Sequence, residues 1–256
     1  MAIVKCAWSG GKDSSCATHL HLLRGDKCIV TNYIPMFTEE IPLLLKEHYE
    51  FIMQTIERWQ EMGAEVYQTH GITYWDWVRK VVTRGPNKGK PHGFPFFGVG
   101  KCGFARDSKN KSLAELDEKF NLQYDYMDLG IAFDEVERHS QLNDKKRSIL
   151  VEERIKENVA TEYCKANGLY SPHYDFDFGK KNKRDGCTLC PQARAKERIE
   201  WFKQYPEAFD LVMELQEFVK QEKPEKKMYP LRDYRFFIEE DMQMSLFEEG
   251  TRYVIN

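Results

Sequence analysis

The first seventy residues alternate short apolar runs with longer amphipathic stretches. Apolar and β-branched positions predict strands over 3–8, 28–34 and 64–69. Between these runs, apolar residues recur at helical spacing up to Gly25 and again over 43–62. Short strands that alternate with helices of ten or more residues are typical of a parallel sheet with helices on both faces. The pattern therefore predicts a doubly wound α/β fold.

The pattern changes after a helix predicted over 74–82. Residues 84–111 are rich in glycine, proline and basic residues and show no periodicity, which is typical of a functional or mobile segment. A fourth strand is predicted over 124–131, followed by helices over 150–167, 192–203 and 206–222. We divide the chain into an α/β core (1–150), a helical, cysteine-containing region packed on it (151–222) and an unassigned tail (223–256).

Composition narrows the class of protein. The 256 residues include 38 Lys and Arg against 41 Asp and Glu, so the net charge is −3. Mean hydropathy is −0.64, and no apolar run approaches the roughly 18–20 residues of a spanning helix. The N-terminal residues lack the pattern of a signal peptide. We expect a soluble, cytoplasmic protein with no membrane partner; the oligomeric state stays open, a homodimer included.

A glycine-rich loop joins the first strand to the first helix. Its glycines let the backbone approach a ligand, and the free amides of the helix start suit a phosphate or pyrophosphate. The spacing is not that of the Walker loop. The alternative is an ordinary turn with a helix cap, which the combination of residues disfavours: Ser9, Gly10, Gly11, Lys12, Asp13, Ser14 and Ser15.

Residues 9–14 resemble the signature of the PP-loop ATP pyrophosphatases, the adenine nucleotide alpha-hydrolase-like superfamily. Residues 129–138 and 163–191 resemble elements of its phosphoadenylyl-sulfate (PAPS) reductase-like branch. The resemblance covers residues 3–215. It implies a five-stranded, Rossmann-like parallel sheet that binds an adenine nucleotide at its carboxyl edge, with residues 1–150 as the nucleotide-binding core.

The resemblance also implies roles for residues. The loop would hold the phosphates of ATP, with Lys12 and Asp13 catalytic and Mg²⁺ bridging the phosphates, and Tyr33 would face the adenosine. Members of the superfamily cleave ATP to AMP and pyrophosphate and adenylate an acceptor, some of them in sulfur transfer. The acceptor here would be a nucleic acid or a small molecule.

Asp134, Glu135 and Arg138 follow the fourth predicted strand. Two carboxylates and a guanidinium suit Mg²⁺ and an anionic group, which would make these residues catalytic. The alternative is that the two acids begin a helix, where they favour the positive end of its dipole.

Two other functions remain open. A thiol-dependent PAPS reductase fits the later motifs, although the chain has no cysteine after Cys190 to serve as the C-terminal nucleophile of those enzymes. A non-catalytic, nucleotide-binding regulatory module would bind ATP without turning it over.

The seven cysteines are an odd number and indicate reduced thiols or metal ligands. Cys187 and Cys190 have the spacing of a metal-chelating or redox pair. With Cys102 and Cys164 they would form a four-cysteine site for a 4Fe–4S cluster or Zn²⁺. His173 is an alternative ligand for zinc, and a cysteine alone on a helix, such as Cys164, is more often a buried small hydrophobic residue.

Two stretches are strongly basic. Residues 79–111 contain nine Lys and Arg against one acid, and 180–198 contain seven against two. Phe94, Phe96 and Phe97 are interleaved with the first stretch, a combination that suits the backbone and bases of a nucleic acid. The alternatives are a solvated loop and a site for a phosphosulfate.

Overall fold

The sheet has five strands, all parallel. The computed structural model describes residues 1–95, 102–176, 186–190 and 192–224. The strand order is β3-β2-β1-β4-β5, and every neighbouring pair is parallel. The predicted parallel α/β fold is confirmed, with strands β1 (Ile3–Trp8), β2 (Lys27–Tyr33), β3 (Glu65–Thr69), β4 (Tyr126–Leu129) and β5 (Lys146–Arg147).

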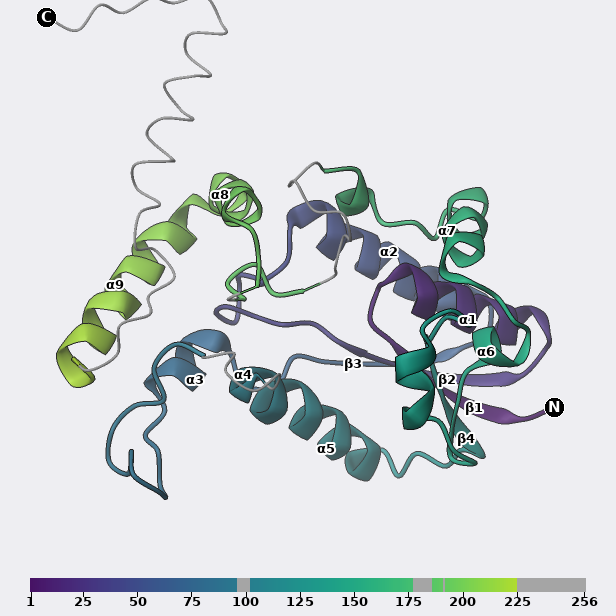
Figure 1. The fold of residues 1–256 in the computed structure, drawn as a ribbon, viewed down its shortest axis with the longest axis horizontal. Helices are drawn as coiled ribbons and strands as arrows, with labels where there is room; N and C mark the ends of the chain where they lie inside the picture. The colour runs from purple at the N-terminus through teal and green to yellow at the C-terminus, as the bar shows by residue number, and fades with distance from the viewer. Residues whose placement is uncertain (96–101, 177–185, 191, 225–256) are drawn as a thin grey trace, which may run out of the picture.

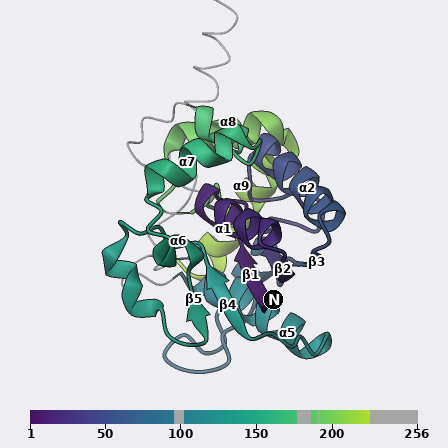
Figure 2. The ribbon, with the colours of Figure 1, turned by 90° about the vertical axis from the view of Figure 1, so that its right-hand side faces the viewer.

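Helices cover both faces of the sheet (Figures 1 and 2). On one face, α1 (Lys12–Leu23) packs on β1 and α2 (Lys46–Glu61) packs on β3. On the other face, α5 (Lys111–Lys119) packs on β2 and β3. The chain runs outward from β1 to β3 and then returns to β4 on the far side of β1. This reversal makes the carboxyl ends of β1 and β4 the expected ligand crevice.

The buried apolar side chains form two clusters. The first joins the sheet, α1 and α2 to α7 (Glu157–Ala166), which packs on α1. The second lies beyond the carboxyl ends of the strands and joins the loop around Phe37 to three helices (Figure 1). At its centre, the fully buried Trp201 donates its indole N–H to the Pro42 carbonyl at 2.8 Å. The three helices are α3 (Tyr74–Arg79), α8 (Ala195–Gln204) and α9 (Pro206–Glu222).

The helix predicted over 150–167 is interrupted. It consists of α6 (Ile149–Glu152) and α7, with Arg154 between them at φ 56°. A non-glycine residue in the left-handed region cannot continue a right-handed helix. Short 3-10 helices lie at Val136–Gln141 and Pro172–Asp175.

The predicted aperiodic stretch 84–111 is partly helical, which is a second correction. It contains α4 (Gly103–Ala105) and a π-helical turn over Arg106–Asn110, which continue directly into α5. The buried positions along this segment are four residues apart, but two of them are serines, so the apolar signal of a helix is absent: Phe104, Ser108, Ser112 and Leu116.

Among the described residues, no helix is both long and apolar enough to cross a membrane. The tail from 225 onward, like Phe96 and Phe97, lies outside the described residues.

Candidate functional site

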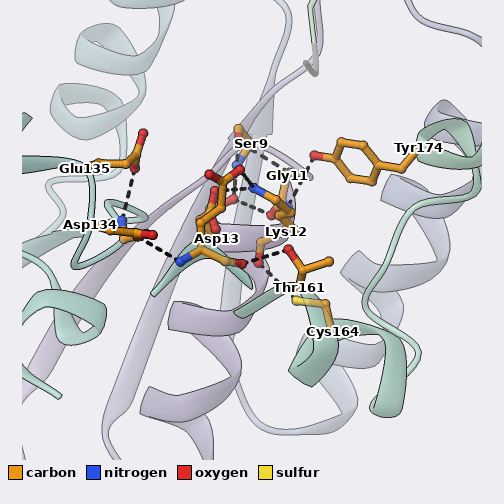
Figure 3. A network of polar contacts seen from close by, with 12 residues as sticks. Ser9, Gly11, Lys12, Asp13, Asp134, Glu135, Thr161, Cys164 and Tyr174 are labelled. Carbon is orange, nitrogen blue, oxygen red and sulfur yellow. Dashed lines mark hydrogen bonds and ion pairs between the residues drawn. The ribbon is translucent and has the colours of Figure 1, made fainter. Parts of the chain in front are cut away.

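The glycine-rich loop lies where β1 ends and α1 begins, as expected (Figure 3). Ser14 closes it from inside, because its hydroxyl donates to the Gly11 carbonyl at 3.0 Å and accepts from the Ser9 amide at 3.2 Å. Gly10 has φ +81°, and a Cβ there would lie 2.7 Å from Ile52. The loop is therefore a tight turn that requires glycine at its apex and serine at its base.

Ser15, at the next position, turns away from the loop. It is fully buried, and its hydroxyl accepts the Trp8 indole N–H at 2.9 Å. Ser15 thus fixes the end of β1 against α1, whereas Ser9 stays exposed at the mouth of the loop.

A second glycine brings β4 against the loop. A Cβ at Gly130 would lie 2.5 Å from the amide nitrogen of Ser14 and 2.6 Å from its Cα. These are backbone atoms of the first turn of α1 and cannot move without moving the loop. Gly130 therefore allows the backbone after β4 to approach the backbone at the start of α1 closely, at the crevice between β1 and β4.

Lys12 and Asp13 form a charged pair on the first turn of α1 (Figure 3). Glu157 joins them from the start of α7. The Lys12 ammonium lies 2.9 Å from Asp13 and 2.8 Å from Glu157. Burial alone would lower the pKa of Lys12, but the two carboxylates raise it above its ordinary value. Glu157 has no motif of its own, and the sequence reasoning missed it.

Asp13 is the most constrained acid of this group. Burial raises the pKa of its carboxyl, and Lys12 only partly offsets this effect. One oxygen, Oδ1, is buried and has no hydrogen-bond partner among the residues that the structure describes. An unpaired buried carboxylate oxygen costs free energy in the folded protein.

The Asp13→Asn substitution is expected to stabilise the fold at pH 7. Because the pKa of Asp13 is raised, the protonated carboxyl stabilises the folded state at low pH, and this contribution is lost as the pH rises through the folded-state pKa. The amide avoids that loss. The urea midpoint of the variant should exceed that of the wild type at pH 7, and the two should converge as the pH falls towards 4. A variant less stable at pH 7 would mean that the ion pair with Lys12 outweighs burial.

Asp134 and Glu135 hold backbone amides. Asp134 accepts from the Glu157 amide at 2.9 Å and so orients the start of α7. Glu135 accepts from the Ala132 amide at 3.0 Å and pairs with Arg138 at 2.8 Å. The charge of Glu135 also contributes to the raised pKa of Asp13. Asp134 is therefore linked to the loop indirectly, because it binds the backbone of Glu157, whose side chain pairs with Lys12. Arg138 is held by its ion pair with Glu135.

The hydroxyl of Tyr174 covers one amide of the loop. It accepts from the Lys12 N–H at 3.4 Å, and it comes from the 3-10 helix that follows α7 (Figure 3). Tyr174 itself is buried.

A cavity of about 280 Å³ opens beside the loop at the carboxyl ends of β1 and β2. Ser9 lies on one wall and Tyr33 on another, and apolar side chains such as Leu44, Ile52 and Phe104 supply much of the rest. The Tyr33 hydroxyl donates to Ser108 at 2.9 Å, and burial raises its pKa. An apolar cavity with a few polar groups suits a small ligand with a flat ring.

Three of the four predicted cysteine ligands line this cavity: Cys102, Cys187 and Cys190. Cys164 does not. Its thiol donates to the Lys12 carbonyl at 3.1 Å beneath the loop, and a hydrogen bond with Cys16 together with burial raises its pKa. Burial also raises the pKa of Cys187, to about 12.

The structure thus brings three of the four predicted cysteines together and leaves Cys164 apart from them. All four cysteines belong to the part of the chain that the structure describes, and no group of three or more metal-ligating side chains there could hold a metal ion. His173, the alternative zinc ligand, does not line the cavity with the three cysteines; its Nδ1 lies 2.8 Å from the Ser171 hydroxyl, and its ring is in contact with His48. A 4Fe–4S cluster or Zn²⁺ at the four cysteines stays a prediction, which the arrangement of the described residues does not support.

The two basic stretches differ. In the second stretch, Arg198 is buried and donates to the carbonyls of Thr188, Cys190 and Ala193, so it orders the cysteine loop. Residues 180–184 lie outside the described residues. In the first stretch, residues 81–90 are almost all exposed, but Phe94 is buried and unavailable for stacking on a base.

No protein-family model matches the chain, and no curated protein matches it. Among solved structures, it is similar to a 4-thiouridine synthetase in a complex with RNA and bound ATP. The identity is 15% and the TM-score 0.42, over 84% of this chain and 53% of the synthetase. The chain thus spans about half the length of that protein.

Proposed function

We propose that this chain is an ATP-using enzyme of the PP-loop pyrophosphatase superfamily, which cleaves ATP to AMP and pyrophosphate and adenylates an acceptor. The observation that carries the proposal is the tight serine- and glycine-rich loop beside a cavity that reaches from Ser9 to Tyr33. Both lie at the carboxyl edge of the sheet, where doubly wound folds bind ligands.

The loop and the cavity beside it suit the phosphates and the adenosine of ATP, respectively. Amides at the start of α1 and the exposed Ser9 hydroxyl suit the phosphates, since the N-terminal end of a helix attracts anions. The apolar cavity suits the adenosine, with Tyr33 on its wall. Lys12 brings positive charge to the place where charge develops on the departing pyrophosphate.

Mg²⁺ fits the same site. The unpaired Oδ1 of Asp13 is a hard oxygen ligand, and Mg²⁺ is usually held by one or two carboxylates together with substrate phosphates. When bound, the ion would neutralise phosphate charge. Asp13 would hold it, and Glu157 and Glu135 would set the local charge; Asp134 would fix Glu157 by capping α7.

The products distinguish this proposal from its alternatives. Incubation with Mg²⁺ and ATP labelled in the α-phosphate should give AMP, with pyrophosphate in equal amount. Formation of ADP would contradict the proposal. Tight ATP binding with no AMP, in the presence of nucleic-acid and small-molecule acceptors, would favour a regulatory module. Sulfite release from PAPS with a thiol reductant would favour a reductase.

Thiol labelling tests where the adenosine lies, independently of turnover. Cys102 and Cys190 line the cavity, so a bound adenosine should shield them from a maleimide. At ATP tenfold above its Kd, we expect their labelling, followed by mass spectrometry, to slow about tenfold. AMP should protect as well. Pyrophosphate, which fills only the loop, should not, and equal protection by pyrophosphate would place the adenosine elsewhere.

Sulfur transfer is the finer part of the proposal. The thiols of Cys102, Cys187 and Cys190 share the cavity with Ser9, which is consistent with chemistry that brings sulfur to an adenylated acceptor. An acceptor converted to a thio derivative only when ATP and a sulfur donor are both present would support it.

A further inference from the structure

A basic hairpin projects from the end of α3, below that helix in Figure 1. Its two arms are joined by hydrogen bonds from Val82 N to Lys90 O and from His92 N to Lys80 O, both 2.9 Å. Residues 79–90 contain five basic side chains and no acidic one, and all five are exposed: Arg79, Lys80, Arg84, Lys88 and Lys90. The hairpin is positively charged although the chain as a whole has a net charge of −3.

A groove of about 420 Å³ separates this hairpin from the start of α5. Lys80, Arg84 and Lys111 line it, together with the hydroxyl groups of Thr83 and Ser112. Two acids also line it, and both have cationic partners. Asp107 pairs with Arg106 at 2.6 Å, and Glu115 lies 3.4 Å from Lys111. The groove thus combines cationic side chains with neutral hydrogen-bond donors.

The groove and the nucleotide cavity share a wall. Ser108, on the π-helical turn, lines the groove, and its hydroxyl donates to the Ile72 carbonyl at 2.7 Å. The same hydroxyl accepts from Tyr33, which lines the cavity. A Cβ at Gly71 would lie 2.5 Å from the Ser108 carbonyl oxygen, so the wall is tightly packed. A polymer lying in the groove would pass within about one side chain of the cavity.

We propose that this groove and the basic hairpin bind the phosphodiester backbone of a nucleic acid. Arginine, lysine and hydroxyl side chains are the groups that contact phosphates along a backbone, and repeated cations suit a repeated charge. A protein partner would need a desolvated apolar anchor; of the large apolar residues on the described hairpin, Val81 is the one left exposed. This proposal depends on the proposed function in one respect: the bound nucleic acid would be the acceptor that the enzyme adenylates.

The test is a fluorescence-anisotropy titration of a labelled 20-nucleotide single strand with the full chain, without ATP, from 50 to 300 mM KCl. RNA and DNA, single and double strands, form the four arms. The hairpin variant combines Arg84→Gln, Lys88→Gln and Lys90→Gln. Its matched control combines Lys119→Gln, Lys145→Gln and Lys146→Gln, three exposed lysines at the far end of the sheet.

In the hairpin variant, the slope of log K against log salt should fall by about 2 for a single strand, because three phosphate contacts are lost. That corresponds to a loss of affinity of roughly a hundredfold at 0.1 M salt. The control should keep the wild-type slope. Equal slopes in the two variants, no binding by the wild type at 50 mM KCl, or equally effective competition by polyglutamate would each overturn the proposal.

ATP binding, measured on the same three proteins, separates the two proposals. Nucleic-acid binding that depends on the hairpin in a protein that binds no ATP would support the groove and contradict the proposed function. ATP binding with no nucleic-acid binding would contradict the proposal for the groove and support the proposed function.

Discussion

Gly130→Ala is expected to weaken ATP binding by about tenfold to a hundredfold. The added methyl group would lie 2.5 Å from the Ser14 amide nitrogen and 2.9 Å from the Asp13 carbonyl carbon. Overpacking of this kind costs about 1–3 kcal/mol, and each 1.4 kcal/mol is a factor of ten in affinity. Since the atoms in the way belong to the glycine-rich loop, the strain would distort the loop itself. Calorimetric titration with ATP measures the effect.

The matched control is Gly25→Ala at the other end of the same helix. A Cβ there has open space within 4 Å, but φ is +76°, so alanine is strained and lowers stability away from the loop. Gly25→Ala should bind ATP as the wild type does. If both variants lose affinity equally, general destabilisation explains the loss, and the contact between Gly130 and the loop has no special role.

Lys12→Gln is expected to lower the rate of AMP formation by about a hundredfold to a thousandfold, the usual effect of removing one group that stabilises charge in a transition state. The variant leaves Asp13 and Glu157 without the cation that lies within 3 Å of both. Their mutual repulsion, and their repulsion of the ATP phosphates, would then be unopposed. Single-turnover chromatography of labelled nucleotide gives the rate.

Lys165→Gln serves as its control. Lys165 is an exposed lysine on α7 that pairs with Glu162 at 2.9 Å. This variant should retain the wild-type rate. A Lys12→Gln enzyme that forms AMP within threefold of the wild-type rate would exclude Lys12 from the chemistry.

Local patterns predicted the parts of this molecule that depend on local sequence. The strands β1, β2 and β3 follow from short apolar runs, and the loop at residues 9–15 follows from its own residues. In contrast, Glu157 and Tyr174 reach the loop from more than 140 residues away, and each shows only a helix-start acid or a lone aromatic in the sequence.

The cysteines also show that spacing along the sequence predicts only part of an arrangement in space. The spacing of Cys187 and Cys190 correctly indicated two neighbouring thiols, but spacing says nothing about which distant residues join them. Cys102 comes to the same cavity on the start of α4. Cys164 is instead buried on α7, where it packs beneath the loop as a small side chain. Tertiary packing decides whether a cysteine lines the cavity or belongs to the core, and a local sequence pattern does not contain this information.

Direct titration of the wild-type protein with ATP, ADP, AMP and adenosine in the presence of Mg²⁺ tests the central claim, that the loop holds the phosphates and the cavity holds the adenosine. Binding of ATP should be one-to-one with Kd below about 1 mM, the range usual for enzyme substrates. Affinity should decrease with each phosphate removed. No binding of ATP, or equal affinities for ATP and adenosine, would contradict the claim.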